Sequence, residues 1–462
     1  MNAKFRVLHW LTLSTMGGAS AYFVHKNDYS IDNIGIIRFA RVGVAATATF
    51  VDYKLMMRKR FATADDYAEQ LRLCHLRAIF FQPEELFSAF SQRPCGAASL
   101  AQVHEATLSD SGERVAVKIQ HPKVKARSVV DIATMEFFTL CAAAFFPEFR
   151  LMWLVEETKR NLPLELNFLH EAKNADRVRD MFAHMKFLKI PKIYYDLSTD
   201  QVLTMEFCEG GQVDDLNYFE THHLDKHEIC RMLGRLYSEM IFVRGFIHCD
   251  PHPGNVLVRR NRKTRREEIV LLDHGLYQNL DESLRVDYSH LWLALMRADK
   301  DEIQRICTRM GLREYYGLFA CIVTLRSWQS ITEGMTSVIV TDEERSQVKQ
   351  FASSLIPQIS SVLDMMPRQM LLILKTNDLI RSIAHRLNSE NRPDSFIEMT
   401  RCCTRAVYTD ALQRAESWPR RVWLRAQMYA TLTRVYIYEK FLIVSEFASN
   451  AFALLRSSTN PV

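Results

Sequence analysis

Two acidic residues and one amide stand at a spacing that suits the transfer of a phosphoryl group. The octapeptide 248–255, His-Cys-Asp-Pro-His-Pro-Gly-Asn, carries Asp250 and Asn255, and Asp273 follows a basic run and an apolar stretch. Phosphoryl transfer depends mostly on positioning and charge neutralisation: one acid orients the nucleophile, while an amide and a second acid hold Mg²⁺. The spacing therefore predicts Asp250 as a catalytic residue, with Asn255 and Asp273 as the metal ligands.

Other parts of a nucleotide site lie upstream, in the order found in protein kinases. The segment 115–118, Val-Ala-Val-Lys, reads as a buried strand that ends in Lys118, the second residue predicted to act in catalysis. A helix predicted over 165–171 carries Glu171, the candidate partner of Lys118. The two side chains are therefore expected to form the ion pair that fixes a lysine for the phosphates of ATP.

A loop of small residues at 95–104 occupies the place of a glycine-rich phosphate loop. Small side chains let the backbone approach a phosphate, although a GxGxxG pattern is absent. A strand at 202–208 runs into a hinge that could hold adenine. The predicted nucleotide contacts are Gly96, Ala97, Ala98 and Ser99 in the loop, Lys118 and Glu171 in the ion pair, and Met205, Glu206 and Cys208 at the hinge.

Each of these features has a plainer interpretation when it is taken alone. Val-Ala-Val-Lys also fits an edge strand with a surface lysine, and Asp-His-Gly at 273–275 also fits a simple turn. The octapeptide 248–255 is different, because two prolines and two histidines around an acid suit an ordinary turn poorly. All the pieces occur in one order over the expected span, which favours a kinase-like nucleotide fold.

At these residues the chain resembles the UbiB family of atypical kinases, the AarF-domain-containing (ADCK) proteins. The shared motifs are Asp-Pro-His-Pro-Gly-Asn at 250–255, Asp-His-Gly at 273–275, Ala-Gln-Val-His at 101–104 and Val-Ala-Val-Lys at 115–118. The segments 146–149, 161–166 and 240–246 look closest to its mitochondrial subgroup, AarF-domain-containing kinase one.

This resemblance covers most of the chain, from about residue 30 onward, and carries expectations about function. It implies a protein-kinase-like fold, binding of ATP and Mg²⁺, and a link to mitochondrial membrane lipids, including ubiquinone in some members. Carried over by position, it also implies that Lys118 and Glu171 form the ion pair, that Asp250 is the catalytic-loop acid, and that Asn255 and Asp273 bind the metal.

The chain departs from the family at two inhibitory elements. The family's Lys-x-Gly-Gln motif is absent, and the segment 53–84 is shorter than the helical extension that usually carries it. The family's Glu-x-Asp reads Glu165-Leu166-Asn167, which keeps an acceptor oxygen but loses a charge. Either the chain is a shortened form or the cover has been lost, so the groove beside Asp250 is expected to be more open.

Composition excludes several other classes of protein. With 462 residues, 48% hydrophobic and 24% charged, the chain is globular, and a net charge of +5 predicts no nucleic-acid partner. The basic run 259–266 reads as a solvated hairpin tip rather than a lipid-headgroup patch. The 10 cysteines are scattered, which argues against disulfides or a metal cluster. Cys249 is predicted to pack, and His104, His248 and His252 to form structural hydrogen bonds.

The N-terminal 27 residues contain three basic residues and no acidic residue. The apolar stretch 7–24 suits a mitochondrial presequence or a single weak membrane span, with a secretory signal as a third option. A second apolar stretch, 36–51, reads as an amphipathic helix, and either stretch could instead be a helix packed on the folded domain. The chain is therefore expected in mitochondria, in contact with a membrane.

The predicted fold class is α+β, a two-lobed protein-kinase-like fold with a β-rich N-lobe, a helical C-lobe and extra terminal helices. The predicted divisions are a targeting or membrane segment at 1–30, a shortened helical extension at 31–90, the N-lobe at 91–206, the C-lobe at 207–390 and a C-terminal helical extension at 391–462. After Gly275 the pattern is helical, with helices predicted at 287–296, 300–310, 347–365, 370–385, 393–413 and 434–455. The last of these follows a break at 418–421 and could dock on the C-lobe or lie on a membrane.

Two classes of function remain open at this point. The first is an ATP-dependent enzyme, either a kinase of a lipid or small molecule or an ATPase that couples hydrolysis to lipid handling. The second is a nucleotide-binding scaffold, or pseudokinase, that supports mitochondrial membranes. No Ala-Pro-Glu segment follows Asp273-His-Gly, and the chain is expected to pass from Gly275 through residues 276–278 into a helix. A protein substrate is therefore ranked below a small molecule or lipid.

Overall fold

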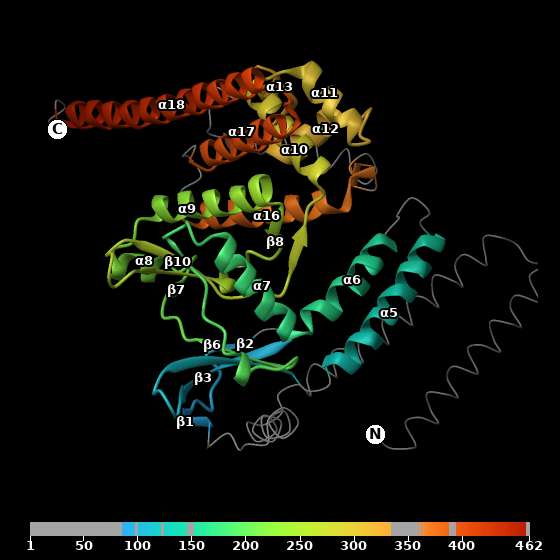
Figure 1. Cartoon of the computed structure of the whole chain (residues 1–462), viewed down its shortest axis with the longest axis vertical. Helices are drawn as coiled ribbons and strands as arrows, with labels where there is room; N and C mark the ends of the chain where they lie inside the picture. Colours follow the sequence, from blue (N-terminus) through green and yellow to red (C-terminus); the bar gives the residue numbers. More distant parts are fainter. Residues whose placement is uncertain are drawn as a thin grey trace, which may run out of the picture.

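The two lobes predicted from the sequence are present in the computed structural model (Figure 1). The structure describes residues 86–97, 100–121, 124–145, 152–333, 359, 362–363, 365–387 and 394–458. The segments 1–30, 36–51, 53–84 and 146–149, on which expectations from the sequence rest, lie outside these residues. The expectation of a more open groove beside Asp250 depended on the segment 53–84 and stays a prediction.

A five-stranded antiparallel sheet forms the small lobe. Its path is β1-β3-β4-β6, and β2 pairs with β3 off this path. The strands are β1 (Phe87–Phe90), β2 (Gly96–Ala97), β3 (Ala101–Leu108), β4 (Arg114–Gln120) and β6 (Val202–Glu206). The sheet therefore begins before residue 91, where the small lobe was expected to start.

Alternation along β4 separates the core of the small lobe from the site. Val115, Val117 and Ile119 pack with Phe87 from β1 on one face. Because successive side chains in a strand point to opposite faces, Lys118 lies on the other face, towards the large lobe.

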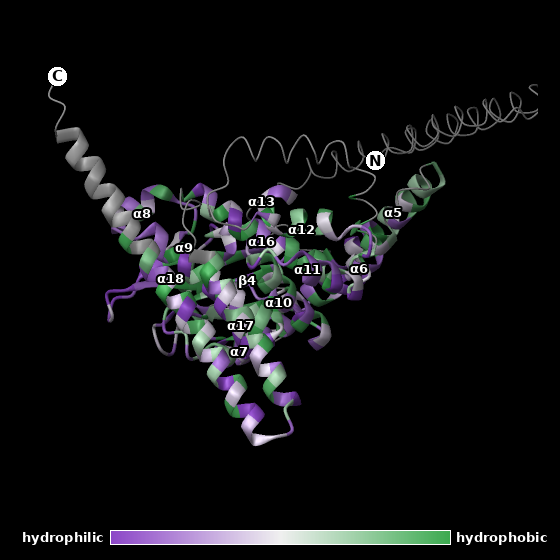
Figure 2. Cartoon of the chain, turned by 90° about the horizontal axis from the view of Figure 1, so that it is seen from above, coloured by the Kyte–Doolittle hydropathy of each residue, from purple (hydrophilic) through white to green (hydrophobic). Residues whose placement is uncertain are grey.

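Two long helices, α5 (Val124–Phe145) and α6 (Met152–Glu165), pack together and project from the small lobe (Figures 1 and 2). Of the described helices, α5 alone has a stretch long and apolar enough to cross a bilayer, Arg127–Phe145, by length and composition. Only 6% of that stretch is buried. Taken singly, such a stretch is weak support for a membrane span.

The prediction of one continuous helix over 165–171 is wrong, because one helix ends and another begins within this segment. α6 ends at Glu165 and α7 (Phe168–Met181) begins after Asn167. Asn167 is extended, with φ −117° and ψ 97°, and its side chain accepts from the N–H groups of Leu169 and His170. A side chain that caps the first turn ends one helix and starts the next.

A second sheet, of order β5-β10-β9-β7, lies at the head of the large lobe, and a two-stranded sheet joins β11 to β8. The strands of both sheets are β5 (Leu188–Lys189), β7 (Gly211–Gln212), β8 (Phe246–His248), β9 (Val256–Arg260), β10 (Glu267–Leu271) and β11 (Tyr277–Asn279). The antiparallel pairing of β9 with β10 confirms a hairpin at the run 259–266, with Arg259 and Arg260 still in β9 and the turn at 261–266. The strand β11 was not predicted, because the chain after Gly275 was expected to be helical. Tyr277–Asn279 instead pairs with Phe246–His248.

The remainder of the described large lobe is mainly helical. Its helices are α8 (Leu216–His222), α9 (Lys226–Ser238), α10 (Glu282–Met296), α11 (Lys300–Arg309), α12 (Tyr316–Thr324), α13 (Trp328–Thr332), α16 (Arg368–Arg386), α17 (Asp394–Arg414) and α18 (Trp418–Ser458), with a π-helical segment at Glu239–Arg244 and short 3₁₀ turns at Tyr195–Leu197 and Pro253–Asn255. Four predicted helices are confirmed as α10, α11, α16 and α17, whereas most of 347–365 lies outside the described residues.

The last helix, α18, begins at Trp418 rather than at residue 434. Pro419 sits in its first turn, where the missing N–H costs nothing. The helix packs on α17 and then extends beyond the lobe (Figure 1), and Arg401 of α17 lies 2.6 Å from Glu439 of α18. The predicted break at 418–421 is therefore a helix start.

Candidate functional site

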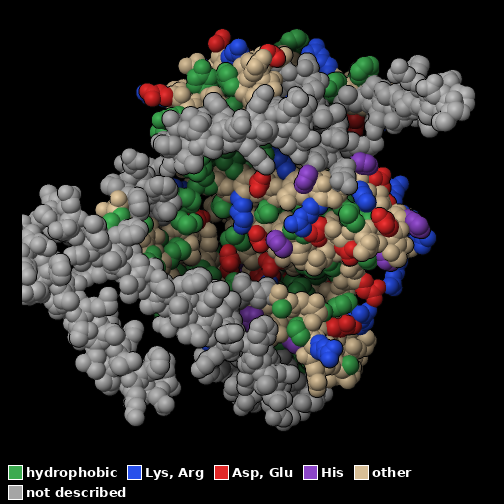
Figure 3. Space-filling model, turned by 180° about the vertical axis from the view of Figure 1, so that it is seen from behind, with side chains coloured by type: hydrophobic (Ala, Val, Ile, Leu, Met, Phe, Trp, Pro, Cys, Tyr) green, Lys and Arg blue, Asp and Glu red, His purple; other side chains and the backbone are tan. Residues whose placement is uncertain are grey.

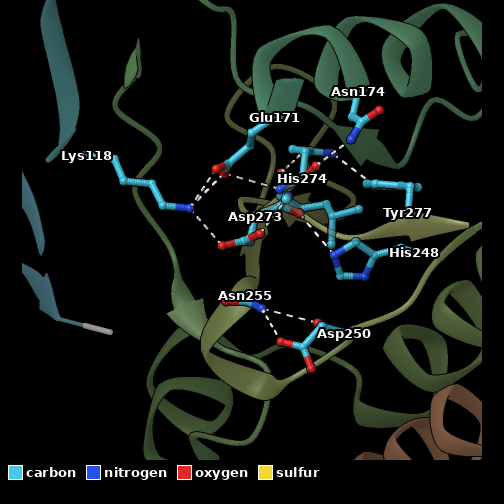
Figure 4. Close-up of polar contacts among 11 residues, drawn as sticks. Lys118, Glu171, Asn174, His248, Asp250, Asn255, Asp273, His274 and Tyr277 are labelled. Atoms are coloured by element: carbon cyan, nitrogen blue, oxygen red, sulfur yellow. Dashed lines mark hydrogen bonds and ion pairs between the residues drawn. The ribbon is translucent and has the colours of Figure 1, made fainter. Parts of the chain in front are cut away.

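The Lys118 ammonium lies between two carboxylates at the boundary of the lobes (Figure 4). Its Nζ atom is 2.8 Å from Oε1 and 2.9 Å from Oε2 of Glu171, and 2.9 Å from Oδ2 of Asp273. The predicted lysine and its predicted helix partner are thus brought together, and the metal-ligand candidate joins them.

Glu171 reaches this position because of where α7 begins. The Asn167 cap places Glu171 in the first turn, and its side chain is almost fully buried. Phe168, also buried, lies under the ammonium of Lys118, with the ring centroid 5.2 Å from Nζ. The amide oxygen of Asn167 thus caps α7, a task that a carboxylate at this position could also perform.

Asp250 and Asn255 are held together within the loop that follows β8. The side-chain amide of Asn255 donates to the backbone carbonyl of Asp250 at 3.1 Å and to its Oδ2 atom at 3.3 Å. His252 caps the intervening 3₁₀ turn, because its Nδ1 atom accepts from Gly254 N–H. Asp250, Asn255 and Asp273 lie near one another, and Asp250 and Asn255 are drawn below Lys118 in Figure 4.

Asp273 is held in place by hydrogen bonds to its side chain and to its backbone carbonyl. Its Oδ1 atom accepts from Gly275 N–H at 2.9 Å, and its backbone carbonyl accepts from Nε2 of His248 at 3.0 Å. Because Nε2 of a neutral His248 donates there, Nδ1 accepts from the hydroxyl of Tyr237 at 3.0 Å. His248 is thus a structural hydrogen-bonding residue, as predicted.

His274 stands where a kinase has phenylalanine, and it holds the turn through polar contacts. Its Nε2 atom is 3.1 Å from the Leu271 carbonyl, and its Nδ1 atom is 2.9 Å from the Tyr277 hydroxyl. Asn174 of α7 donates to the backbone carbonyl of His274 at 3.0 Å, which ties the helix to the turn. Burial lowers the pKa of His274 to about 3, so the ring is neutral.

The pKa values of Lys118, Asp273 and Glu171 reflect two opposing effects, burial and the charge of the neighbouring groups. Burial opposes the charge on Lys118, but the Asp273 and Glu171 carboxylates outweigh it and raise the lysine pKa. Burial likewise opposes the charge on Asp273, but Lys118 prevails and holds the aspartate pKa well below its usual range. Burial raises the pKa of Glu171 to about 7, against the opposing effect of Lys118. Lys118 therefore favours the charged form of both acids against the effect of burial.

The oxygen atoms at this site fit Mg²⁺. Asp273 offers a charged carboxylate, and Asn255 retains its amide oxygen because its NH₂ group is the part that binds Asp250. Among the described residues, no group of three or more His, Cys, Asp or Glu side chains could hold a metal by itself. Mg²⁺ is commonly held by one or two carboxylates together with substrate phosphates and water, so this sparse set is suitable.

The predicted phosphate loop is only partly described. Gly96 and Ala97 form β2, are exposed, and pair with Val103 and Gln102 of β3. Ala98 and Ser99 lie outside the described residues. A Cβ atom at Gly96 would meet nothing closer than 4.0 Å, so space alone does not demand glycine there.

The predicted hinge follows the strand next to β4. Met205, at the end of β6, pairs with Ala116, and both Met205 and Cys208 are buried. The Glu206 carboxylate binds Lys189 at 2.6 Å, so its side chain already has a cationic partner.

Two charged residues near Asp250 were not among the predicted site residues, and only Glu165 belongs to a recognised motif. Lys375 of α16 lies 3.2 Å from Oδ1 of Asp250, although the two are 125 residues apart. Burial, with Asp273 and Asp250 close by, raises the pKa of Glu165 at the end of α6. Acidic side chains gather in the hollow between the lobes (Figure 3).

Comparison with known proteins gives matches over most of the chain. Residues 69–307 match the ABC1 atypical kinase-like domain. The chain is 51% identical over 359 residues to AarF domain-containing protein kinase 1 of Gallus gallus, covering 78% of this chain and 69% of the relative. It is 50% identical over 360 residues to the Mus musculus protein of the same name, covering 78% and 68%. It is 46% identical over 368 residues to AarF domain-containing kinase 1 of Drosophila melanogaster, covering 79% and 71%.

A solved structure of a Mycobacterium tuberculosis protein in complex with erythromycin has a similar fold. The TM-score is 0.51 at 17% identity, and the match covers 84% of this chain and 95% of the other.

Proposed function

Because the chain belongs to the ABC1 (AarF-domain) family of atypical kinase-like proteins, we propose that it binds ATP with Mg²⁺ between its lobes and transfers or hydrolyses the terminal phosphoryl group. The observation that carries this proposal is the convergence of Lys118 and Glu171 with Asp273, beside Asp250 and Asn255. Each of these residue types matches a part that phosphoryl transfer needs.

Each residue has a distinct task in this proposal. Lys118 binds the phosphates, and Glu171 keeps its ammonium in place. Asp273 and Asn255 hold Mg²⁺, which neutralises charge that develops on the phosphate oxygens. Asp250 orients the attacking hydroxyl or water and accepts its proton.

The present ion pairs suit the arrival of a nucleotide. Lys118 now contacts both Glu171 and Asp273. On binding, Lys118 would exchange Asp273 for a phosphate, and Asp273 would turn to Mg²⁺. Neither charge is left unpaired by this exchange, which matters because an uncompensated buried charge is costly.

We infer that the phosphate acceptor is a lipid, a small molecule or water rather than a protein. After Gly275 the chain forms the short strand β11 and then α10, with no Ala-Pro-Glu segment between them. A role in mitochondrial membrane lipid homeostasis is the form of this function that we propose. The basic, acid-free N-terminus and the exposed apolar face of α5 support contact with a membrane.

A nucleotide-binding scaffold is the second candidate. It is favoured by the missing Lys-x-Gly-Gln motif and by Asn167 in place of an aspartate. The two candidates differ in turnover, not in binding.

Mg²⁺-dependent ATP turnover by the whole chain, with and without phospholipid vesicles, separates them. An enzyme predicts formation of ADP that falls to background in Asp250→Asn while Mg·ATP still binds. A scaffold predicts Mg·ATP binding with turnover no higher than that of Asp250→Asn. Failure to bind Mg·ATP would contradict both candidates.

A further inference from the structure

Lys375 approaches the proposed catalytic acid from a helix outside the matched family domain. It lies on α16, whereas the family match ends at residue 307. Its Nζ atom is 3.2 Å from Oδ1 of Asp250, and both side chains are about half exposed. An exposed ion pair of this kind contributes little to folding, so stability alone does not account for it.

The loop that carries Asp250 contains no cation of its own. Between Asp250 and Asn255 the sequence is Pro-His-Pro-Gly, without lysine or arginine. The Lys118 ammonium, which is proposed to bind the phosphates, contacts Glu171 and Asp273 rather than Asp250. A phosphoryl group in transfer spreads negative charge over its equatorial oxygens, and a fixed cation beside it lowers the barrier.

α16 holds Lys375 on a well-anchored turn of helix. The neighbouring Thr376 and Asn377 are buried, and the Asn377 amide donates to the Tyr288 hydroxyl at 3.3 Å. Arg386, near the end of the same helix, forms an ion pair with Asp214. Because this turn of α16 is anchored while the Lys375 side chain is about half exposed, Lys375 can reach a ligand without refolding.

The positive charge of Lys375 also acts on Glu165 at the end of α6. Burial, Asp273 and Asp250 raise the pKa of Glu165, and Lys375 opposes that rise. Lys375 therefore interacts with two acidic residues of the site, with Asp250 by direct contact and with Glu165 through its charge.

We propose that Lys375 binds the terminal phosphoryl group of ATP on the side of Asp250, so that α16 completes the active site. This inference rests on the proposed function. In the step itself, the bond from phosphorus to the ADP oxygen breaks and its electron pair leaves with ADP. The acceptor oxygen forms the new bond to phosphorus, its proton passes to Asp250, and Lys375 keeps its own protons.

The test compares Lys375→Gln and Lys375→Arg with Arg386→Gln, a matched control that removes another exposed, paired cation from α16. Affinities for Mg·ATP and Mg·ADP are measured by calorimetry on the whole chain, together with kcat and KM for ATP. Lys375→Gln should lower the ratio of ATP to ADP affinity about tenfold, since a charge-assisted hydrogen bond to the terminal phosphate is lost. Mg·ADP affinity should stay within about twofold, because ADP lacks that phosphate.

The other variants define what would overturn the inference. Lys375→Arg should restore most of the ATP preference, and Arg386→Gln should match the wild type. If Lys375→Gln keeps the wild-type ratio, or loses ATP and ADP equally, Lys375 does not bind the terminal phosphate while the proposed function stands. If the wild type binds neither nucleotide, both the proposed function and this inference are wrong.

Discussion

The Nζ atom of Lys118 lies 2.9 Å from Oδ2 of Asp273, and this ion pair joins the two lobes across 155 residues of sequence. Lys118 belongs to β4 of the small lobe, whereas Asp273 follows β10 of the large lobe. Glu171 of α7 contacts the same ammonium. One cation therefore offsets two acids, and the packing of the lobes at the site depends on it.

Replacing Lys118 with methionine should destabilise the chain strongly. Glu171 and Asp273 would then face each other without a cation, and breaking a buried pair in this way costs about 3 kcal/mol or more. Urea unfolding of the two proteins measures the difference. The double variant Lys118→Met, Glu171→Gln should recover part of the loss, because one buried acid is removed. An unchanged unfolding midpoint in Lys118→Met would contradict the arrangement.

The side chain of Asn167 should stabilise the start of α7. Asn167→Ala should lower the free energy of unfolding by about 1 kcal/mol, because Leu169 and His170 lose the acceptor for their N–H groups. Asn167→Asp should leave stability unchanged or slightly higher, since a carboxylate also caps and suits the positive end of a helix. Equal loss in both variants would mean that the amide has another role.

Gly211 and Gly96 should respond differently to the same substitution. A Cβ atom at Gly211 would lie 2.1 Å from Cγ of Tyr218, so β7 or α8 must shift. Gly211→Ala should therefore destabilise the chain by about 2 kcal/mol, within the range for overpacking. Gly96→Ala should change stability by no more than about 0.5 kcal/mol, as exposed sites usually do. Chemical unfolding of both variants is the measurement, and a tolerant Gly211 would contradict the close approach.

Residues 1–30 should direct an attached reporter to mitochondria. The reason is the combination of three basic residues with no acid over the first 27 positions and an apolar stretch from 7 to 24. Imaging and fractionation of the fusion provide the readout, and alkaline extraction then separates a spanning segment from a peripheral contact. A reporter that stays in the cytosol would refute the prediction.

Motif spacing predicted the parts of the site whose positions are fixed locally. Asp250 and Asn255 lie within one loop, so their proximity follows from the octapeptide itself. The pairing of Lys118 with Glu171 was predictable because a strand and a helix in kinase order place them on facing elements.

Contacts that depend on tertiary packing were not predictable in this way. Lys375 reaches Asp250 only because α16 packs against the large lobe, and nothing near Lys375 in the sequence marks it. The helix break at Asn167 was missed because the surrounding residues favour a helix, and the cap forms only when the chain turns. The strand β11 was missed for a similar reason, since its short length gives little alternation and it depends on pairing with β8.

Calorimetry of ATP binding to the wild type and to Asp273→Asn, with and without Mg²⁺, measures whether the site binds the nucleotide together with a metal held by Asp273. We expect the wild type to bind ATP with Mg²⁺, and we expect EDTA, which removes the metal, or Asp273→Asn, which removes its charged ligand, to weaken this binding at least about tenfold. ATP affinity that is the same with and without Mg²⁺, or the same in Asp273→Asn as in the wild type, would contradict this expectation.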